Sequence, residues 1–213
     1  MQSFDARASA SSRAFSLVEL LTVMAIIAVL LGLVIPASTG IGQGFNVTSA
    51  GQTVADQFTL ARQTALEQNR SAEIRFYYLK SSASGSQIFR GMQVWKQVSN
   101  QGTPGYLAVS RVVYLPNGFK LLQDVGSTAY SPLVNADTFA SYKNTDNLPA
   151  GAAAGSYYMA VRFRGTGNPE ATLTPTTNYV TVASERETGG ATPKNFYTVQ
   201  IDPLTGRTLG YRP

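Results

Sequence analysis

Residues 14–35 read A-F-S-L-V-E-L-L-T-V-M-A-I-I-A-V-L-L-G-L-V-I. This stretch holds one charge, Glu19, and the residues from Leu20 to Ile35 hold none. An α-helix built from them is apolar on every face, so it must lie in lipid or inside a protein assembly. Which of these two environments surrounds the helix determines how the rest of the chain is organised.

The length of the apolar stretch permits one membrane span. As a helix, the 21 residues from Phe15 to Ile35 measure about 32 Å, close to the roughly 30 Å hydrocarbon core of a bilayer. Glu19 is unusual there, because a carboxylate at mid-bilayer costs about 2.5 kcal/mol or more and tends to mark a functional partner. Glu19 lies near one end of the stretch, where this cost is smaller.

Two general interpretations explain the stretch without a family. A secretory signal peptide accounts for Arg7 and Arg13, but the apolar run exceeds the usual core of about 7 to 15 residues and Ile35-Pro36-Ala37 is a poor cleavage site. A plain signal anchor fits by length, and the preceding arginines would keep the N-terminus cytoplasmic. In that interpretation Ser16-x-x-Glu19 is a capping box, and Glu19 is no more than part of a helix cap.

The stretch also resembles the N-terminus of type IV prepilins and pseudopilins. Four features agree in order and spacing: a short polar leader, a cleavage point before Phe15, Glu19 four residues later, and an apolar helix followed by Pro36. The family usually has Gly before the cut, whereas this chain has Ala14, the smallest substitute.

This resemblance implies a processing and assembly route. A membrane-embedded prepilin peptidase would cut between Ala14 and Phe15 and methylate the new amine, leaving residues 1–14 as a leader. Glu19 would then face the N-terminal amine of a neighbouring subunit, so that the charge held in lipid is paired. The resemblance places the chain in the bacterial inner membrane as a single-pass protein with an extracytoplasmic domain.

Composition narrows the chemistry of that domain. The 213 residues suffice for a membrane helix and one ordinary domain, and the chain contains neither Cys nor His. Disulfides, thiolate metal sites, cysteine nucleophiles and the Ser-His-Asp triad are therefore excluded. The net charge of +5 falls to +4 once a leader with two arginines and one aspartate is removed, which is a mild bias.

Residues 36–47 begin P-A-S-T-G-I-G-Q-G and concentrate residues that loosen a helix. We therefore expect a kink at Pro36 or a melted linker there, as in assembled pilins; an ordinary flexible tether explains the composition equally well. From Thr48 to Asn69 the helical period returns. An apolar stripe contains Val54, Phe58, Ala61 and Ala65, and Asn69 is a suitable C-terminal stop.

After Ser71 the period changes to that of β-strands. Alternation in the first strand predicts that one of its faces is buried. Turn signals separate the segments, which predicts antiparallel hairpins and an α+β, pilin-like fold of one long helix packed on about seven strands. The expected strands are residues 71–78, 88–98, 106–115, 119–122, 157–164, 178–184 and 196–202, with residues 207–212 as a final edge strand.

Residues 123–155 show no sustained period and read as a loop insertion in the domain at residues 48–213. We interpret the insertion as mobile, because its aromatic residues Tyr130, Phe139 and Tyr142 are scattered. A contact surface displayed on a filament is the alternative.

Later segments resemble narrower groups. Residues 61–70 (A-R-Q-T-A-L-E-Q-N-R), residues 162–167 (R-F-R-G-T-G) and Gly206-Arg207 resemble GspH/FimT-type minor pseudopilins. Residues 196–203 (F-Y-T-V-Q-I-D-P) and the end Y-R-P resemble more closely the prepilin-like proteins called Verru_Chthon cassette protein D. The resemblance implies a structural subunit of a type II secretion or type IV pilus-like filament, with other pilins, the prepilin peptidase and the inner membrane as partners.

The sequence leaves two other classes of function to consider, nucleic-acid binding and catalysis. Some FimT-like minor pilins take part in DNA uptake, which makes Arg207 and Arg212, with Arg162 and Arg164, candidate phosphate contacts. Alternate arginines on an outer strand are also common for solubility alone. An enzyme has little support, because the carboxylates Asp56, Glu67 and Glu73 form no pair in an apolar context, and we expect no catalytic residue, cofactor or metal.

Overall fold

The computed structural model describes residues 16–81, 84–100, 103–123, 130–134, 145–170, 173–174, 176–187 and 193–213. Within these ranges the side chains of residues 32–45, 99–100 and 103–104 are not described. The predicted leader, the cleavage point between Ala14 and Phe15, and the centre of the insertion lie outside the described residues. The chain divides into two compact units, Met1–Gln43 and Gly44–Pro213.

A single helix, α1 (Leu17–Gln68), passes through the boundary between the units. The melted linker predicted at residues 36–47 is therefore wrong, because the backbone is helical throughout that range. Helix propagation is cooperative, so a chain that already has helical turns on both sides can absorb the one hydrogen bond that a proline removes. The side chain of Pro36 is not described, and a kink there stays a prediction.

In the unit Gly44–Pro213, α1 buries one apolar stripe. Its six members are at most 1% exposed, and their spacings of three and four residues are those of one helix face: Val47, Ala50, Val54, Phe58, Ala61 and Ala65. The predicted stripe of Val54, Phe58, Ala61 and Ala65 is thus confirmed. Phe58 packs against two rings of the sheet, with its ring centroid 5.4 Å from that of Phe76 and 6.5 Å from that of Phe163.

The C-terminus of α1 is closed by Asn69. Its φ of 46° is left-handed, which Asn tolerates better than most residues. The backbone N–H of Arg70 donates to the carbonyl of Ala65 (3.3 Å), and the N–H of Asn69 donates to that of Leu66 (3.3 Å), the two bonds of a Schellman motif. The predicted stop at Asn69 is confirmed.

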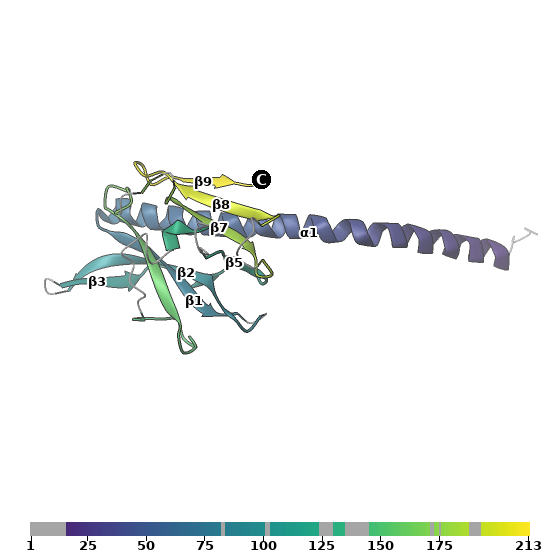
Figure 1. Ribbon diagram of the computed structural model, residues 1–213, viewed down its shortest axis with the longest axis horizontal. Coiled ribbons are helices and arrows are strands. Elements are labelled where there is room, and N and C mark those ends of the chain that lie inside the picture. Colours follow the sequence, from purple (N-terminus) through teal and green to yellow (C-terminus); the bar gives the residue numbers. More distant parts are fainter. Residues whose placement is uncertain are drawn as a thin grey trace, which may run out of the picture. The chain divides into compact units, whose positions relative to one another are not determined.

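Within the described residues the sheet has nine strands, all pairing antiparallel, and Figure 1 shows several of them labelled. The α+β prediction is confirmed, with more strands than the predicted seven. The spatial order is β6-β1-β2-β5-β7-β8-β9, with β3 and β4 also paired to β2. The strands are β1 (Ala72–Lys80), β2 (Gln87–Asn100), β3 (Thr103–Ala108), β4 (Val113–Tyr114), β5 (Phe119–Leu121), β6 (Tyr157–Phe163), β7 (Tyr179–Ser184), β8 (Phe196–Ile201) and β9 (Thr208–Tyr211).

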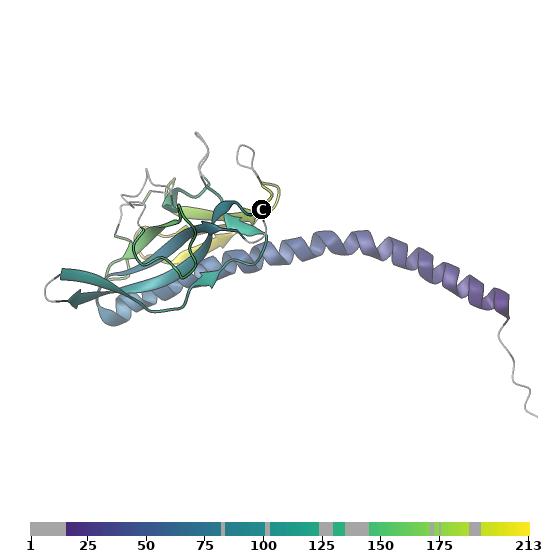
Figure 2. The same cartoon turned by 90° about the horizontal axis from the view of Figure 1, so that it is seen from below.

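The strand predicted at residues 106–115 is divided into β3 and β4. Ser110 lies between them and interrupts the ladder, because its Oγ, rather than a backbone carbonyl, accepts the Val94 N–H (3.2 Å). The interval between the strands predicted at residues 88–98 and 106–115 is mostly strand, since β2 extends to Asn100 and β3 begins at Thr103. The β2–β3 ribbon extends beyond the rest of the sheet in both views (Figure 1, Figure 2).

Strand β1 is buried on both faces, not on one as the alternation suggested. Ile74 and Phe76 join the helix in the main core, and the opposite face carries Tyr77 (0% exposed) and Leu79, which pack with Tyr158. The second face is covered because β1 lies between β2 and β6, whose outward side chains close over it. We call the cluster of Tyr77, Leu79 and Tyr158 the outer core.

Residues 130–134 of the insertion are packed, which corrects the interpretation of the insertion as mobile over that segment. A 3₁₀ helix, η1 (Pro132–Val134), buries all its residues, and Tyr130 packs with Leu122 and Ala183. The hydroxyl of Ser131 accepts the Thr181 N–H (2.9 Å) and so satisfies a donor of β7 beyond the end of β5. A few apolar residues, although scattered in the sequence, are therefore enough to pack this part of the loop against the sheet.

Gly51 tests how closely α1 packs against β8. A Cβ at this position would clash with the ring of Tyr197. Helix propensity alone favours Ala over Gly by about 1 kcal/mol, whereas overpacking costs about 1–3 kcal/mol. We expect Gly51→Ala to lower the free energy of unfolding by about 1 kcal/mol or more, measured by urea denaturation of the full chain in detergent.

The matched control is Gln52→Ala, on the exposed side of the same turn, where we expect a change within about 0.5 kcal/mol. A Gly51→Ala variant more stable than the parent would show that the helix does not need this close approach.

Candidate assembly and processing site

Helix α1 begins immediately after the predicted cleavage point. The Ser16 hydroxyl accepts the Val18 N–H (3.2 Å), and the Ser16 carbonyl accepts the Leu20 N–H (3.2 Å), so Ser16 is the N-cap. This geometry supplies the serine half of the predicted capping box, with Val18 as the donor. A chain cut before Phe15 would present its new amine two residues before the first helical residue, Leu17.

Glu19 lies in the first turn of α1 and is exposed. A carboxylate at this position is favourable to the helix, because it interacts with the unpaired N–H groups and the positive end of the helix dipole. Glu19 makes no hydrogen bond or ion pair with any described residue. The helix therefore accommodates the charge, and its carboxylate is accessible to a second molecule.

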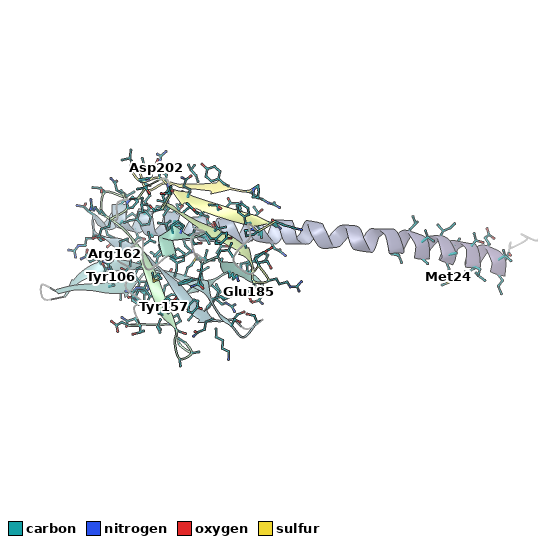
Figure 3. The ribbon with its side chains drawn as sticks, viewed as in Figure 1. Met24, Tyr106, Tyr157, Arg162, Glu185 and Asp202 are labelled. Atoms are coloured by element: carbon teal, nitrogen blue, oxygen red, sulfur yellow. The ribbon has the colours of Figure 1, made fainter. Side chains whose placement is uncertain are left out.

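The side chains around Glu19 form an exposed apolar surface. Every residue from Ser16 to Leu31 is exposed, and in Figure 3 side chains project from opposite sides of the helix around Met24. Eleven large members are between 49% and 77% exposed: Leu17, Val18, Leu20, Leu21, Val23, Met24, Ile26, Ile27, Val29, Leu30 and Leu31. Such a surface needs a covering partner.

A search of the described residues found no helix that is long and apolar enough to cross a membrane.

The candidate nucleic-acid residues Arg207 and Arg212 flank β9. The Arg212 guanidinium donates to the Thr48 hydroxyl (3.0 Å), and the Arg207 carbonyl accepts the Asp202 N–H (2.8 Å) across the β8–β9 turn. Backbone N–H bonds from Thr205 and Leu204 lower the pKa of Asp202. These contacts anchor the β8–β9 hairpin.

The other two candidates lie on or near β6, at the opposite end of the strand order from β9. Arg164 donates to the Glu170 carbonyl (3.2 Å), and Arg162 donates to the Glu73 carboxylate (2.8 Å). Arg162 is thus part of an ion-pair cluster within the sheet. In the described sheet, the strand that carries Arg162, β6, does not pair with β9, which Arg207 and Arg212 flank.

Sequence reasoning missed a buried charge cluster on the outer face of the sheet. Glu73, 1% exposed, accepts hydrogen bonds from Arg75 (2.6 Å) and from Arg162 (2.8 Å), so that one carboxylate serves two guanidinium groups. The signal in the sequence was the i, i+2 spacing of Glu73 and Arg75, which places opposite charges on the same face of a strand. What covered that face could not be read from β1 alone.

Aromatic rings enclose the Arg75 guanidinium. Its Cζ lies 3.9 Å from the centroid of the Trp95 ring and 4.3 Å from that of Tyr158, and Tyr106 lies 5.3 Å from the Cζ of Arg162. Figure 3 shows Tyr106 and Arg162 beside each other. Cation–π attraction stabilises such a desolvated guanidinium by about 2 kcal/mol. The cluster links β6, β1 and β2 to one another, and its charged groups are used in contacts that stabilise the sheet.

Tyr77 continues this network into the outer core. Its hydroxyl donates to Gln93 Oε1 (2.8 Å) and accepts the Trp95 indole N–H (3.1 Å), and Gln93 Nε2 donates to the Ser110 carbonyl (2.8 Å). Burial raises the pKa of Tyr77 to about 12. Within the described ranges, no group of three or more Asp or Glu side chains could hold a metal ion.

Comparison with protein families identifies the N-terminal segment. The model of the prokaryotic N-terminal methylation motif matches residues 9–35, which include Ala14, Phe15 and Glu19. The match supports a type IV pilin-like substrate of a prepilin peptidase. Searches of curated proteins and of solved structures found no match to the chain.

The buried tyrosines predict an alkaline limit to stability. An unfolded Tyr77 ionises near pH 10, whereas the folded one keeps its proton to about pH 12, so the unfolded state binds fewer protons in between. Stability should therefore fall as pH rises through this window. Burial raises the pKa values of Tyr106, Tyr157 and Tyr158 in the same direction.

The measurement is urea unfolding of the full chain between about pH 9 and pH 12. We expect Tyr77→Phe to be less stable than the parent near neutral pH, because it loses two hydrogen bonds, but to lose less stability per pH unit in the alkaline window. Tyr211→Phe removes a phenol from the surface and is the matched control. An unchanged alkaline slope in Tyr77→Phe would contradict the role of this tyrosine.

Proposed function

We propose that the protein is a non-enzymatic structural subunit, a minor pseudopilin or pilin, of a type II secretion or type IV pilus-like filament. The observation that carries the proposal is the N-terminal methylation motif at residues 9–35. The prepilin peptidase cuts before Phe15 and methylates the new amine. The unit Gly44–Pro213 is then displayed outside the inner membrane, with the apolar helix as its single-pass anchor.

The exposed apolar surface of α1 supports the assembly step. In the membrane, lipid covers these side chains, and in a filament the helices of neighbouring subunits cover them instead. Both environments are apolar, so transfer of the helix from the membrane to the filament changes the hydrophobic free energy little. The preference for the filament must therefore come from helix packing and from polar contacts. Glu19 supplies such a contact.

Glu19 selects the position of the neighbouring subunit. Its carboxylate is exposed in the first turn, among large apolar side chains. Away from water, a carboxylate is stable only when it is paired and hydrogen-bonded. The methylated amine of Phe15 in a neighbouring subunit is the cation of the same motif, so pairing with Glu19 fixes the axial register between subunits.

Processing is tested by the intact mass of the protein, purified from membranes of cells that also express a prepilin peptidase. We expect a chain that has lost residues 1–14 and gained one methyl group. Ala14→Gly should be processed at least as completely as the parent, whereas Ala14→Leu, with a larger side chain beside the scissile bond, should stay uncut.

Cells without the peptidase provide the control and should yield the uncut chain. A chain that still starts at Met1 in the presence of an active peptidase, or one cut near Ala37, would exclude the proposal, the second result in favour of a signal peptide.

Assembly is tested by Glu19→Ala. We expect membrane insertion to be intact and incorporation into filaments to fall more than tenfold, because an unpaired buried amine costs about 3–5 kcal/mol. Incorporation is measured as the fraction of subunit in sheared filaments, and insertion by membrane fractionation.

Thr22→Ala is the matched control, since the Thr22 hydroxyl donates to the Val18 carbonyl of its own helix (2.7 Å). We expect this variant to assemble like the parent. Normal incorporation of Glu19→Ala would reduce Glu19 to a residue that stabilises the start of α1.

A further inference from the structure

Strand β2 contains a β-bulge at Arg90. On β1, Tyr77 is opposite Gly91 and Tyr78 is opposite Phe89, so Arg90 is an extra residue in the ladder. Phe89 and Met92 both lie in the main core although they are three residues apart. Bulges re-aim side chains in this way, and here the bulge keeps both Arg90 and Gly91 out of the main core.

A cavity of about 270 Å³ lies beside the bulge, on the outer face of the sheet. It is lined by Leu79, Lys80, Arg90, Tyr114 and the loop residues Pro149, Ala150, Gly151, Ala152 and Ala153. The loop is held in place, because Gln87 Nε2 donates to the Ala154 carbonyl (2.9 Å) and the Ala152 N–H donates to the Pro149 carbonyl (3.1 Å). Ala152 also packs against the outer core.

Both charged residues among those that line the cavity are cations. Lys80 comes from the end of β1 and Arg90 from the bulge, and none of the described lining residues carries a carboxylate. Arg90 is oriented by Asn117, whose Oδ1 accepts from its Nη2 (3.4 Å), and by the Tyr114 ring, 5.7 Å from its Cζ. Two cations around one concave site attract an anion.

The rest of the lining is apolar. Leu79, Tyr114, Pro149 and three alanines present carbon surface to the cavity. Gly91 makes this arrangement possible, because a Cβ there would lie 3.2 Å from Leu79 Cδ1 and 3.4 Å from Tyr114 Cε1. A phosphate or sulfate ion would leave these walls uncovered, whereas a carboxylate attached to an apolar group would use both parts of the lining.

We propose that this cavity binds a small organic carboxylate that carries an aromatic or aliphatic group, with Arg90 and Lys80 on the carboxylate and Leu79 and Tyr114 on the apolar group. The terminal residue of a peptide and a free carboxylic acid both have this chemistry. The volume fits one such group, since sites for larger ligands begin at about 300 Å³. The site goes beyond the proposed filament role and does not depend on it.

The experiment is calorimetric titration of the full chain in detergent with four probes: N-acetyl-L-phenylalanine, its amide, 3-phenylpropionate and inorganic phosphate. We expect the two carboxylates to bind at least tenfold more tightly than the amide and the phosphate. Tighter binding of N-acetyl-L-phenylalanine than of 3-phenylpropionate identifies a peptide end as the ligand, and the reverse order identifies a free acid.

Variants locate the binding. Arg90→Gln and Lys80→Gln should each weaken carboxylate binding tenfold or more, whereas Arg186→Gln, which removes an exposed charge outside the lining, should not change it. Near-ultraviolet circular dichroism checks that each variant is folded. If Arg90→Gln does not fold, the affinity of Lys80→Gln for the carboxylates tests the proposal. Equal binding of acid and amide, equal binding of phosphate, no binding of either carboxylate, or affinities unchanged in the folded variants would overturn the proposal.

Discussion

The packing of one helix stripe against the main-core face of the sheet is the interaction on which the unit Gly44–Pro213 depends. The stripe consists of Val47, Ala50, Val54, Phe58, Ala61 and Ala65, and three of the six are alanines, which let the backbone of α1 come close to the strands. The closest approach is at Gly51, which lies against the Tyr197 ring on β8. Strand β9 contacts the same helix through Thr208, whose hydroxyl lies 3.3 Å from that of Thr59. Phe58 of the same helix packs against Phe76 of β1, so the first strand and the last two strands all pack on α1.

The opposite face of the sheet is organised by charge and aromatic rings. Burying Glu73 and Arg75 costs several kcal/mol of desolvation, which their mutual attraction and the rings of Trp95 and Tyr158 offset. An apolar pair could supply similar stability. The charged residues also specify how the strands pair. The Glu73 carboxylate has one oxygen on Arg75 and the other on Arg162, and both bonds form in only one register of β6 against β1.

Much of the fold could be predicted from the sequence because it rests on local periodicity: the stripe of α1, its end at Asn69 and most of the strands. The errors concern what covers a segment. Alternation in β1 indicated one buried face, but β6 and β3 bring residues from distant parts of the sequence over Glu73 and Arg75. Tyr130 looked isolated because Leu122 and Ala183, its partners, lie elsewhere in the chain. At residues 36–47, composition favoured a break, but helix on both sides outweighed it. Of the candidate site, Ser16 and Glu19 were readable from spacing, whereas the cavity beside Arg90 needed the bulge.

The junction between α1 and β1 has a mechanical consequence. The Schellman turn at Asn69 leaves three residues between Gln68 and Ala72, a connection that can extend by no more than about 10 Å. Tension applied along α1 therefore reaches β1 almost without slack. Strand β1 is bonded on both sides, to β2 and to β6, so a pull along it loads two ladders in shear and many hydrogen bonds resist together. A domain joined in this way transmits force from its helix to its sheet, and the strand that receives the force is paired along both edges.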